Sequence, residues 1–284
     1  MNRLVAYPCF ILFLLLMFKP ARAQVKWITN FDEAKKMALS ENKLLLVDFW
    51  AKWCGPCLRM DRDVWVNDEV IELSDKFVLV RVNVDYSRGL SMRYGADRIP
   101  TMTFLDCTGN KLFHYTGYKD ARELSYIMSL IPTHLAPIYD LIENLEKNPD
   151  NFVLQMALGD SYRLLGTVLK TRLPVDLILN LSNDYYKTAS KSKRMNNRPR
   201  LLDKAQTSMA MNYLAMGNSR KVKSIIKKCL EKFPESKHRP AHLYCMIQAN
   251  LQLQDRRKAR KFFDLLISEF PEDGYSRKAQ AFFD

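Results

Sequence analysis

Cysteine, glycine and proline are all scarce in this chain. Its 284 residues include six cysteines, 9 glycines and 12 prolines. So few cysteines exclude a small scaffold held together by disulfides. With 48% hydrophobic residues, the chain has enough apolar material to build packed cores, and nothing in its composition indicates extended disorder. Its length predicts about two domains.

Long apolar runs are missing except at the N-terminus. Residues 1–23 combine Arg3 with an apolar stretch at 4–18 and end in Ala21-Arg22-Ala23, a small-x-small pattern typical of cleavage sites. The apolar stretch is shorter than the roughly 20 residues of a membrane span. We therefore predict a signal peptide over residues 1–23 and export to a bacterial periplasm, with an uncleaved membrane anchor as the alternative.

Export would leave an odd number of cysteines in the mature chain. Cys9 would leave with the signal peptide, and an odd count leaves at least one thiol free or paired with another molecule. We expect Cys107 to be a small buried hydrophobic residue, with a regulatory thiol as the alternative. We expect Cys229 and Cys245 to be packed free thiols, with a disulfide between them as the alternative. The five cysteines that remain are Cys54, Cys57, Cys107, Cys229 and Cys245.

Acidic residues balance the basic ones only in the first half of the chain. Residues 24–131 carry 15 Lys/Arg and 15 Asp/Glu, whereas residues 132–284 carry 26 and 16, a net charge of +10. Nucleic acid would suit that charge, but the predicted export and the lack of a binding motif argue against it. We expect a solvated basic face, or one that docks an acidic client or anionic membrane headgroups.

Residues 24–131 alternate between helical and strand patterns. Amphipathic segments predict helices, and apolar or β-branched runs predict strands, the last two of which flank a hairpin turn. This alternation predicts an α/β fold in which helices flank a mixed sheet. The expected helices cover 31–40, 58–76, 87–94 and 120–131, and the expected strands cover 44–50, 77–84, 101–105 and 111–116.

Strand patterns stop after residue 131, and residues 132–284 predict an all-helical domain. The segment LEKFPES at 230–236 recurs as ISEFPED at 267–273, and each follows a helical pair with a polar turn. This spacing resembles tetratricopeptide repeats, which stack helix pairs at a period of about 34 residues. An irregular helical bundle is the alternative. Stacked helical repeats usually present concave protein-binding surfaces.

Cys54 and Cys57 form a C-x-x-C pair directly after the expected strand at 44–50. A structural zinc site needs about four ligands, and no second C-x-x-C is present. His238 and His242 are four residues apart but have no carboxylate at a useful spacing, so we predict no metal and no other cofactor. A disulfide across two residues constrains the unfolded chain little.

Thiol–disulfide exchange explains this pair better than a zinc site or a structural disulfide. At a helix N-terminus, backbone NH groups and the helix dipole stabilise a thiolate, which is the attacking species. Pro56 suits the first helical turn, where its missing NH costs nothing, and Gly55 lets the loop pass closely. We therefore predict that Cys54 attacks a client disulfide and that Cys57, one turn further on, resolves the mixed disulfide.

The segment VDFWAKWCGPC at 47–57 closely resembles the active site of thioredoxins, and the resemblance covers about residues 25–131. It implies that Asp48 is a buried acid that helps move the proton of Cys57. It also implies that Ile99-Pro100-Thr101 is a loop with a cis proline that faces the cysteines and positions the client. The substrate-binding residues implied in this way are Trp53, Gly55, Pro56, Ile99, Pro100, Thr101 and Gly117.

Two features depart from the common thioredoxin pattern. Arg81 stands where many thioredoxins have a lysine, and we expect it to hold Asp48 ionised without sharing a proton, because arginine does not deprotonate. The expected active-site helix also lacks the proline that commonly kinks it. The segment RDVWVNDEVIELSDKFVLVRVNVD at 62–85 is instead similar to exported thioredoxin-like domains, including the C-terminal domain of the transmembrane electron-transporting reductase.

The resemblance implies an exported thiol–disulfide oxidoreductase that acts on client proteins. Gly-Pro between the cysteines is similar to reducing members, and a reductant in the oxidising periplasm needs an electron donor, which we expect to be a membrane protein. The helical half would select or hold the partner. The alternative function is a helical interaction scaffold whose thioredoxin-like domain binds clients with little turnover.

Overall fold

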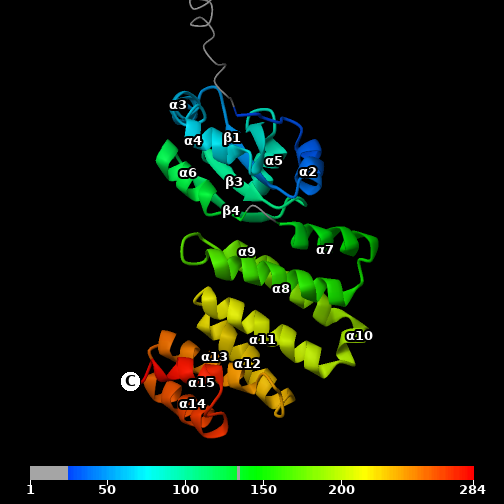
Figure 1. The fold of residues 1–284 in the computed structure, drawn as a ribbon, viewed down its shortest axis with the longest axis vertical. Coiled ribbons are helices and arrows are strands. Elements are labelled where there is room, and N and C mark those ends of the chain that lie inside the picture. Colours follow the sequence, from blue (N-terminus) through cyan, green and yellow to red (C-terminus); the bar gives the residue numbers. More distant parts are fainter. Residues whose placement is uncertain (1–24, 133–134) are drawn as a thin grey trace, which may run out of the picture.

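The computed structural model describes residues 25–132 and 135–284. The predicted signal peptide at 1–23 lies outside the described residues. Within them, every strand precedes residue 117 and only helices follow residue 120 (Figure 1). No helix in the described part of the chain combines the length and apolar character that crossing a membrane requires.

A four-stranded mixed sheet forms the centre of the first half, in the order β2-β1-β3-β4. The inner strand β1 (Leu44–Trp50) pairs in parallel with β2 (Phe77–Asn83) and antiparallel with β3 (Thr101–Leu105), which forms a hairpin with β4 (Lys111–Thr116). Six of the seven residues of β1 are buried, as its unbroken apolar run predicts. The predicted mixed sheet and hairpin are confirmed.

Helices surround this sheet, and one of the predicted helices is divided in two. The single helix expected over 58–76 is wrong, because α3 (Gly55–Asp63) ends before a new helix, α4 (Asp68–Ser74), begins. The side chain of Asn67 accepts hydrogen bonds from the backbone NH groups of Glu69 and Val70, which caps a fresh N-terminus. The remaining helices of this half are α2 (Phe31–Ser40), α5 (Arg88–Tyr94) and α6 (Ala121–Ser129).

The second half of the described chain is a stack of helices, which confirms the predicted all-helical region. Helices α8 and α9 pack together, as do α11 with α12 and α13 with α14, and these pairs lie one beyond another along the molecule (Figure 1). A strictly tetratricopeptide-like arrangement stays a prediction. The helices are α7 (Ala136–Lys147), α8 (Phe152–Leu169), α9 (Asp176–Lys191), α10 (Lys193–Asn196), α11 (Pro199–Ala215), α12 (Ser219–Lys232), α13 (Arg239–Gln252), α14 (Arg256–Glu269) and α15 (Gly274–Gln280).

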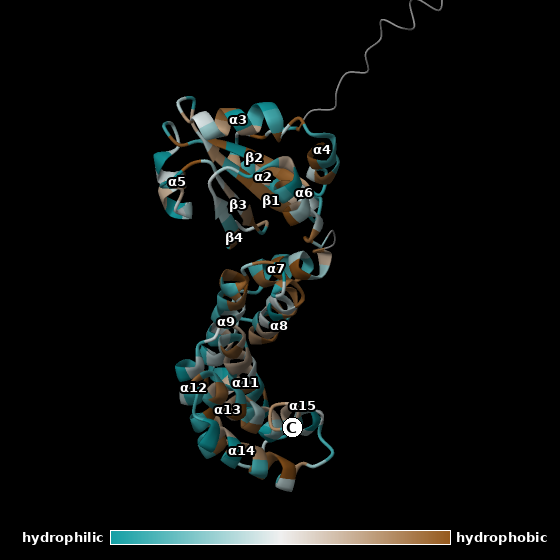
Figure 2. Cartoon of the chain, turned by 90° about the vertical axis from the view of Figure 1, so that its left-hand side faces the viewer, coloured by the Kyte–Doolittle hydropathy of each residue, from teal (hydrophilic) through white to brown (hydrophobic). Residues whose placement is uncertain are grey.

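The two halves share one hydrophobic core, which runs from Ala34 in α2 to Leu179 in α9. Two buried tyrosines reinforce it with hydrogen bonds: Tyr139 Oη donates to the Lys43 carbonyl at 2.8 Å, and Tyr162 Oη donates to Asp106 Oδ2 at 2.7 Å. Strand β4 also packs against α9. The boundary between residues 131 and 132 stays a prediction, but the helices beyond it pack directly on the sheet (Figure 2).

Candidate active site

Cys54 and Cys57 lie at the start of α3 and are joined by a disulfide. Cys54 is the N-cap residue, and its Sγ accepts a hydrogen bond from the backbone NH of Cys57 at 3.2 Å. Both side chains are nearly buried, with 3% and 2% of their surface exposed. After reduction, the same NH group and the positive end of the helix would stabilise a thiolate on Cys54.

The surface beside the cysteines is open to a client. The ring of Trp53 is 69% exposed, and its Nε1 donates to both carboxylate oxygens of Asp85, at 3.2 and 3.1 Å. Gly55 and Pro56 are also exposed, and no atom lies within 4 Å of where a Cβ on Gly55 would stand. Asp85 was not among the predicted site residues, although its place just after β2, at the carboxyl end of that strand, could have pointed to it.

The loop before β3 meets the cysteine pair, as the resemblance implied. The Ile99–Pro100 peptide bond is cis, and Ile99 packs against the small cluster that holds Cys54 and Cys57. The carbonyl of Pro100 accepts a hydrogen bond from the NH of Gly117 at 2.8 Å. Gly117 has φ +91° and open space at its Cβ position, so a side chain there would strain the backbone and narrow the surface.

Thr101 does not fit the client-contacting role predicted for it. Its side chain is fully buried, because Thr101 is the first residue of β3 and its Oγ1 donates to the carbonyl of Arg98 at 2.6 Å. The hydroxyl also lies 3.1 Å from that of Thr116 on β4. Thr101 therefore supports the loop from inside the fold.

Asp48 is a buried acid on the central strand β1, six residues before Cys54. Only 2% of its surface is exposed, and its Oδ1 has no hydrogen-bond partner among the described residues. Burial raises the pKa of Asp48 to about 7, against the opposing effect of the Arg81 charge. A carboxyl group with such a pKa exchanges protons near neutral pH, which is what a general acid–base group needs.

Arg81 lies near two acids, Asp48 and Asp61, so the expectation that it holds Asp48 ionised stays a prediction. Its Nη2 lies 2.6 and 2.8 Å from the two carboxylate oxygens of Asp61 on α3, whereas its Nε is 3.5 Å from Asp48 without hydrogen-bond geometry. The guanidinium also stacks over Trp50, 4.0 Å from the ring centroid. No sequence pattern pointed to Asp61, because its pairing with Arg81 exists only in the folded chain.

The other cysteines are placed as predicted. Cys107, Cys229 and Cys245 are buried free thiols in the described structure. Burial raises the pKa of the Cys107 thiol far above its ordinary value, so this thiol stays protonated and is a poor nucleophile. Among the described cysteines, only Cys54 and Cys57 therefore lie at a helix N-terminus beside exposed residues such as Trp53.

Comparisons with known proteins agree with this geometry. A family described as "Thioredoxin-like" matches residues 26–107. Thioredoxin-1 of Drosophila yakuba is 32% identical over 107 residues, which cover 38% of this chain and 94% of that protein. Thioredoxin-T of Drosophila melanogaster is 36% identical over 92 residues, covering 32% of this chain and 56% of that protein.

Among solved structures, a thioredoxin from Thermus thermophilus is 23% identical, with a TM-score of 0.34, and the match covers 37% of this chain and 85% of that one. The two sequence relatives cover 38% or less of this chain. Nearly all of one thioredoxin is nevertheless covered at 32% identity. The chain therefore belongs to the thioredoxin family, the class of thiol–disulfide oxidoreductases that its sequence predicted.

Proposed function

We propose that this chain is an exported protein-disulfide reductase whose helical half holds the client. The observation that carries the proposal is the Cys54–Cys57 pair at the N-terminus of α3, beside the exposed ring of Trp53. An exchange-competent pair needs a stabilised thiolate and an open approach for the client disulfide. The N-cap position of Cys54 supports the first need after reduction, the exposed ring of Trp53 supports the second, and the resolving sulfur lies one helical turn into α3.

The reaction transfers two electrons from the dithiol to the client. The Cys54 thiolate attacks one client sulfur, which breaks the client disulfide, forms a mixed disulfide and releases the other client sulfur as a thiolate. The Cys57 thiolate then attacks Cys54 Sγ, which releases the second client thiolate and leaves the oxidised pair seen in the structure. Asp48 accepts the proton of Cys57, and a thiol donor, which we expect to be a membrane protein, supplies two electrons and two protons to reset the pair.

Trapping clients tests this proposal and identifies the partners. Cys57→Ser removes the resolving sulfur, so mixed disulfides between Cys54 and clients should accumulate. We expect Cys57→Ser, expressed with its N-terminal segment in a Gram-negative bacterium, to form adducts that disappear on treatment with dithiothreitol. Fractionation of the adducts shows whether the clients are exported proteins.

The doubly substituted Cys54→Ser/Cys57→Ser protein is the matched control and should form no adduct. Adducts that persist in this control would come from other thiols and would contradict the proposed roles. If the Cys54–Cys57 pair of the wild-type protein is fully oxidised in cells whose electron donors are intact, the proposed role as a reductant is contradicted.

A groove in the helical half is suited to hold an acidic segment of the client. Helices α8, α11, α13 and α15 line a cavity of about 500 Å³, to which Arg163, Lys170 and Lys278 contribute positive charge and no acid contributes. The Nε of Arg163 is buried without a hydrogen-bond partner in the described structure. Tyr244 and Tyr275, with ring centroids 5.1 Å apart, give the groove an aromatic wall. A carboxylate-rich peptide would pair these charges.

Removing the groove charges should weaken the binding of an acidic peptide while leaving the chemistry intact. For the combined change Arg163→Gln, Lys170→Gln and Lys278→Gln, we expect the Kd of a fluorescein-labelled peptide of alternating Glu and Tyr to rise by about tenfold or more. Fluorescence anisotropy at low and high salt measures it, because salt screens such pairs.

The matched control removes three exposed cations from α12 and α14 by Lys228→Gln, Arg257→Gln and Lys261→Gln. We expect this variant to keep the wild-type Kd, and both variants to reduce a small aromatic disulfide at the wild-type rate. Equal weakening in the two variants would show that net charge, and not the groove, attracts the peptide.

A further inference from the structure

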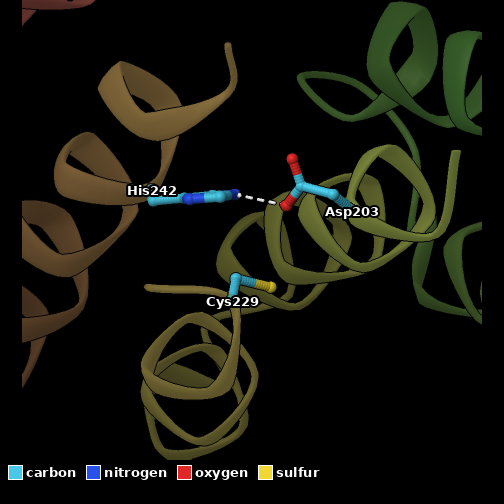
Figure 3. Close-up of side chains that lie close together, drawn as sticks. All are labelled: Asp203, Cys229 and His242. Atoms are coloured by element: carbon cyan, nitrogen blue, oxygen red, sulfur yellow. Dashed lines mark ion pairs between the residues drawn. The ribbon is translucent and has the colours of Figure 1, made fainter. Parts of the chain in front are cut away.

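Three side chains of metal-ligand type meet inside the helical half. Asp203 on α11, Cys229 on α12 and His242 on α13 point toward one another where the three helices pack (Figure 3). Their carboxylate oxygen, sulfur and imidazole nitrogen all lie within 4.8 Å of one another, and no more than 3% of any of the three residues is exposed. The sequence offered His242 no carboxylate at a useful spacing, but packing of the helices brings one to it.

Polar atoms in this cluster are left unsatisfied. Asp203 Oδ1 lies 3.2 Å from His242 Nε2 but makes no hydrogen bond, and His242 Nδ1 is also buried without a partner in the described structure. The Nε2 atom lies 2.7 Å from Thr207 Oγ1, and the Cys229 thiol donates to Gln206 Oε1 at 3.3 Å. A buried polar atom without a partner costs free energy, and a cation between Asp203 Oδ1, His242 Nε2 and the sulfur would offset that cost for Asp203 Oδ1.

We propose that Asp203, Cys229 and His242 bind a zinc ion. Carboxylate oxygen, imidazole nitrogen and thiolate sulfur are the usual zinc ligands, at about 2.0–2.3 Å from the metal. Tetrahedral ligands at these distances lie about 3.5 Å apart, so the cluster has to contract by about an ångström. Binding releases the Cys229 proton, and the carboxylate and thiolate then neutralise the two charges of the ion, which suits a buried site.

A cavity beside the cluster supplies an entrance and the fourth ligand. It measures about 640 Å³ and is lined by Asp203, Ser236 and His238, among others. A zinc ion held by three protein ligands takes a water molecule as the fourth, and this cavity places solvent next to Asp203. His238 also lines it, and its Nε2 is buried without a hydrogen-bond partner in the described structure, so it is placed to accept a hydrogen bond from that water.

Titration with cobalt, which replaces zinc and is coloured, tests the site. The background is the full chain with Cys54→Ser/Cys57→Ser, so the active-site thiols do not contribute. We expect one equivalent of Co²⁺ to bind with a thiolate-to-cobalt charge-transfer band in the near ultraviolet, and Zn²⁺ to displace it. Cys229→Ser should remove the band. Asp203→Asn and His242→Gln should each raise the Kd for Co²⁺ by about tenfold or more.

Cys245→Ser is the matched control, because Cys245 is a buried free thiol on α13 that is not one of the three clustered residues. It should keep the band. Circular dichroism checks the fold of each variant. We also expect Zn²⁺ to raise the Tm of the background protein, which tests metal binding without any substitution in the cluster. No band and no rise in Tm, or a band that survives Cys229→Ser in folded protein, would overturn the proposal and leave a hydrogen-bonded cluster.

Discussion

Replacing Cys54 by serine is expected to abolish the reduction of insulin disulfides by this chain. Cys54 is the N-cap residue of α3, and its sulfur receives a backbone hydrogen bond that would stabilise the thiolate. A serine hydroxyl at the same place is not ionised near neutral pH and is a poor nucleophile toward sulfur. We expect turnover to fall at least about 10³-fold, measured by the turbidity of reduced insulin with dithiothreitol as electron donor.

The controls for this prediction separate the two functions considered. Cys107→Ser should keep wild-type turnover, because that buried thiol is not activated. Cys54→Ser should keep the wild-type circular dichroism spectrum and the affinity for the acidic peptide. If wild-type protein binds the peptide but reduces no insulin while its cysteine pair is reduced, the chain is an interaction scaffold and the enzyme proposal fails.

Replacing Asp48 by asparagine is expected to stabilise the fold at alkaline pH. The pKa of Asp48 is about 7 in the folded chain, against 3.8 as its ordinary value, because burial disfavours the charged form. Below pH 3.8 the group is protonated in both folded and unfolded states and costs nothing. Between that pH and about 7, Asp48 is ionised in the unfolded chain but protonated in the folded chain. The free energy of unfolding of the wild-type protein therefore falls as the pH rises.

The size of this loss follows from the difference in pKa. The difference between a pKa of about 7 and one of 3.8 corresponds to about 4 kcal/mol as an upper limit. We expect Asp48→Asn to gain a few kcal/mol over wild type between pH 4 and pH 8, measured by urea unfolding of the oxidised proteins. The exposed carboxyl group of Asp75 gives a matched control, and Asp75→Asn should show no such gain. A wild-type protein that becomes more stable than Asp48→Asn as the pH rises would contradict the assignment.

The same variant reports on catalysis. Asparagine cannot accept the proton of Cys57, so we expect resolution of the mixed disulfide to slow by about 10- to 100-fold at pH 7. Stopped-flow measurement of client thiol release resolves this step from the first attack by Cys54, which should change little. A gain in stability with unchanged resolution would make Asp48 a buried acid without a role in proton transfer.

Local features of the chain could be predicted from the sequence. The alternation of strands and helices, the hairpin between β3 and β4, and the cysteines at a helix N-terminus follow from patterns a few residues long. Turn residues, capping and hydrophobic period act over that range. The one helix that was predicted wrongly, over 58–76, shows the limit, because the Asn67 cap outweighed a continuous helical pattern.

Tertiary structure decided how side chains from distant segments pair. Arg81 lies 3.5 Å from Asp48 on the neighbouring strand, yet its closer partner, at 2.6 Å, is Asp61 on α3. Packing also buried Thr101 and brought Asp203, Cys229 and His242 together from three helices. The sequence by itself determined the exchange chemistry of Cys54 and Cys57. Only the fold decided the partners of the charged residues, because such contacts depend on how whole elements pack and not on their spacing along the chain.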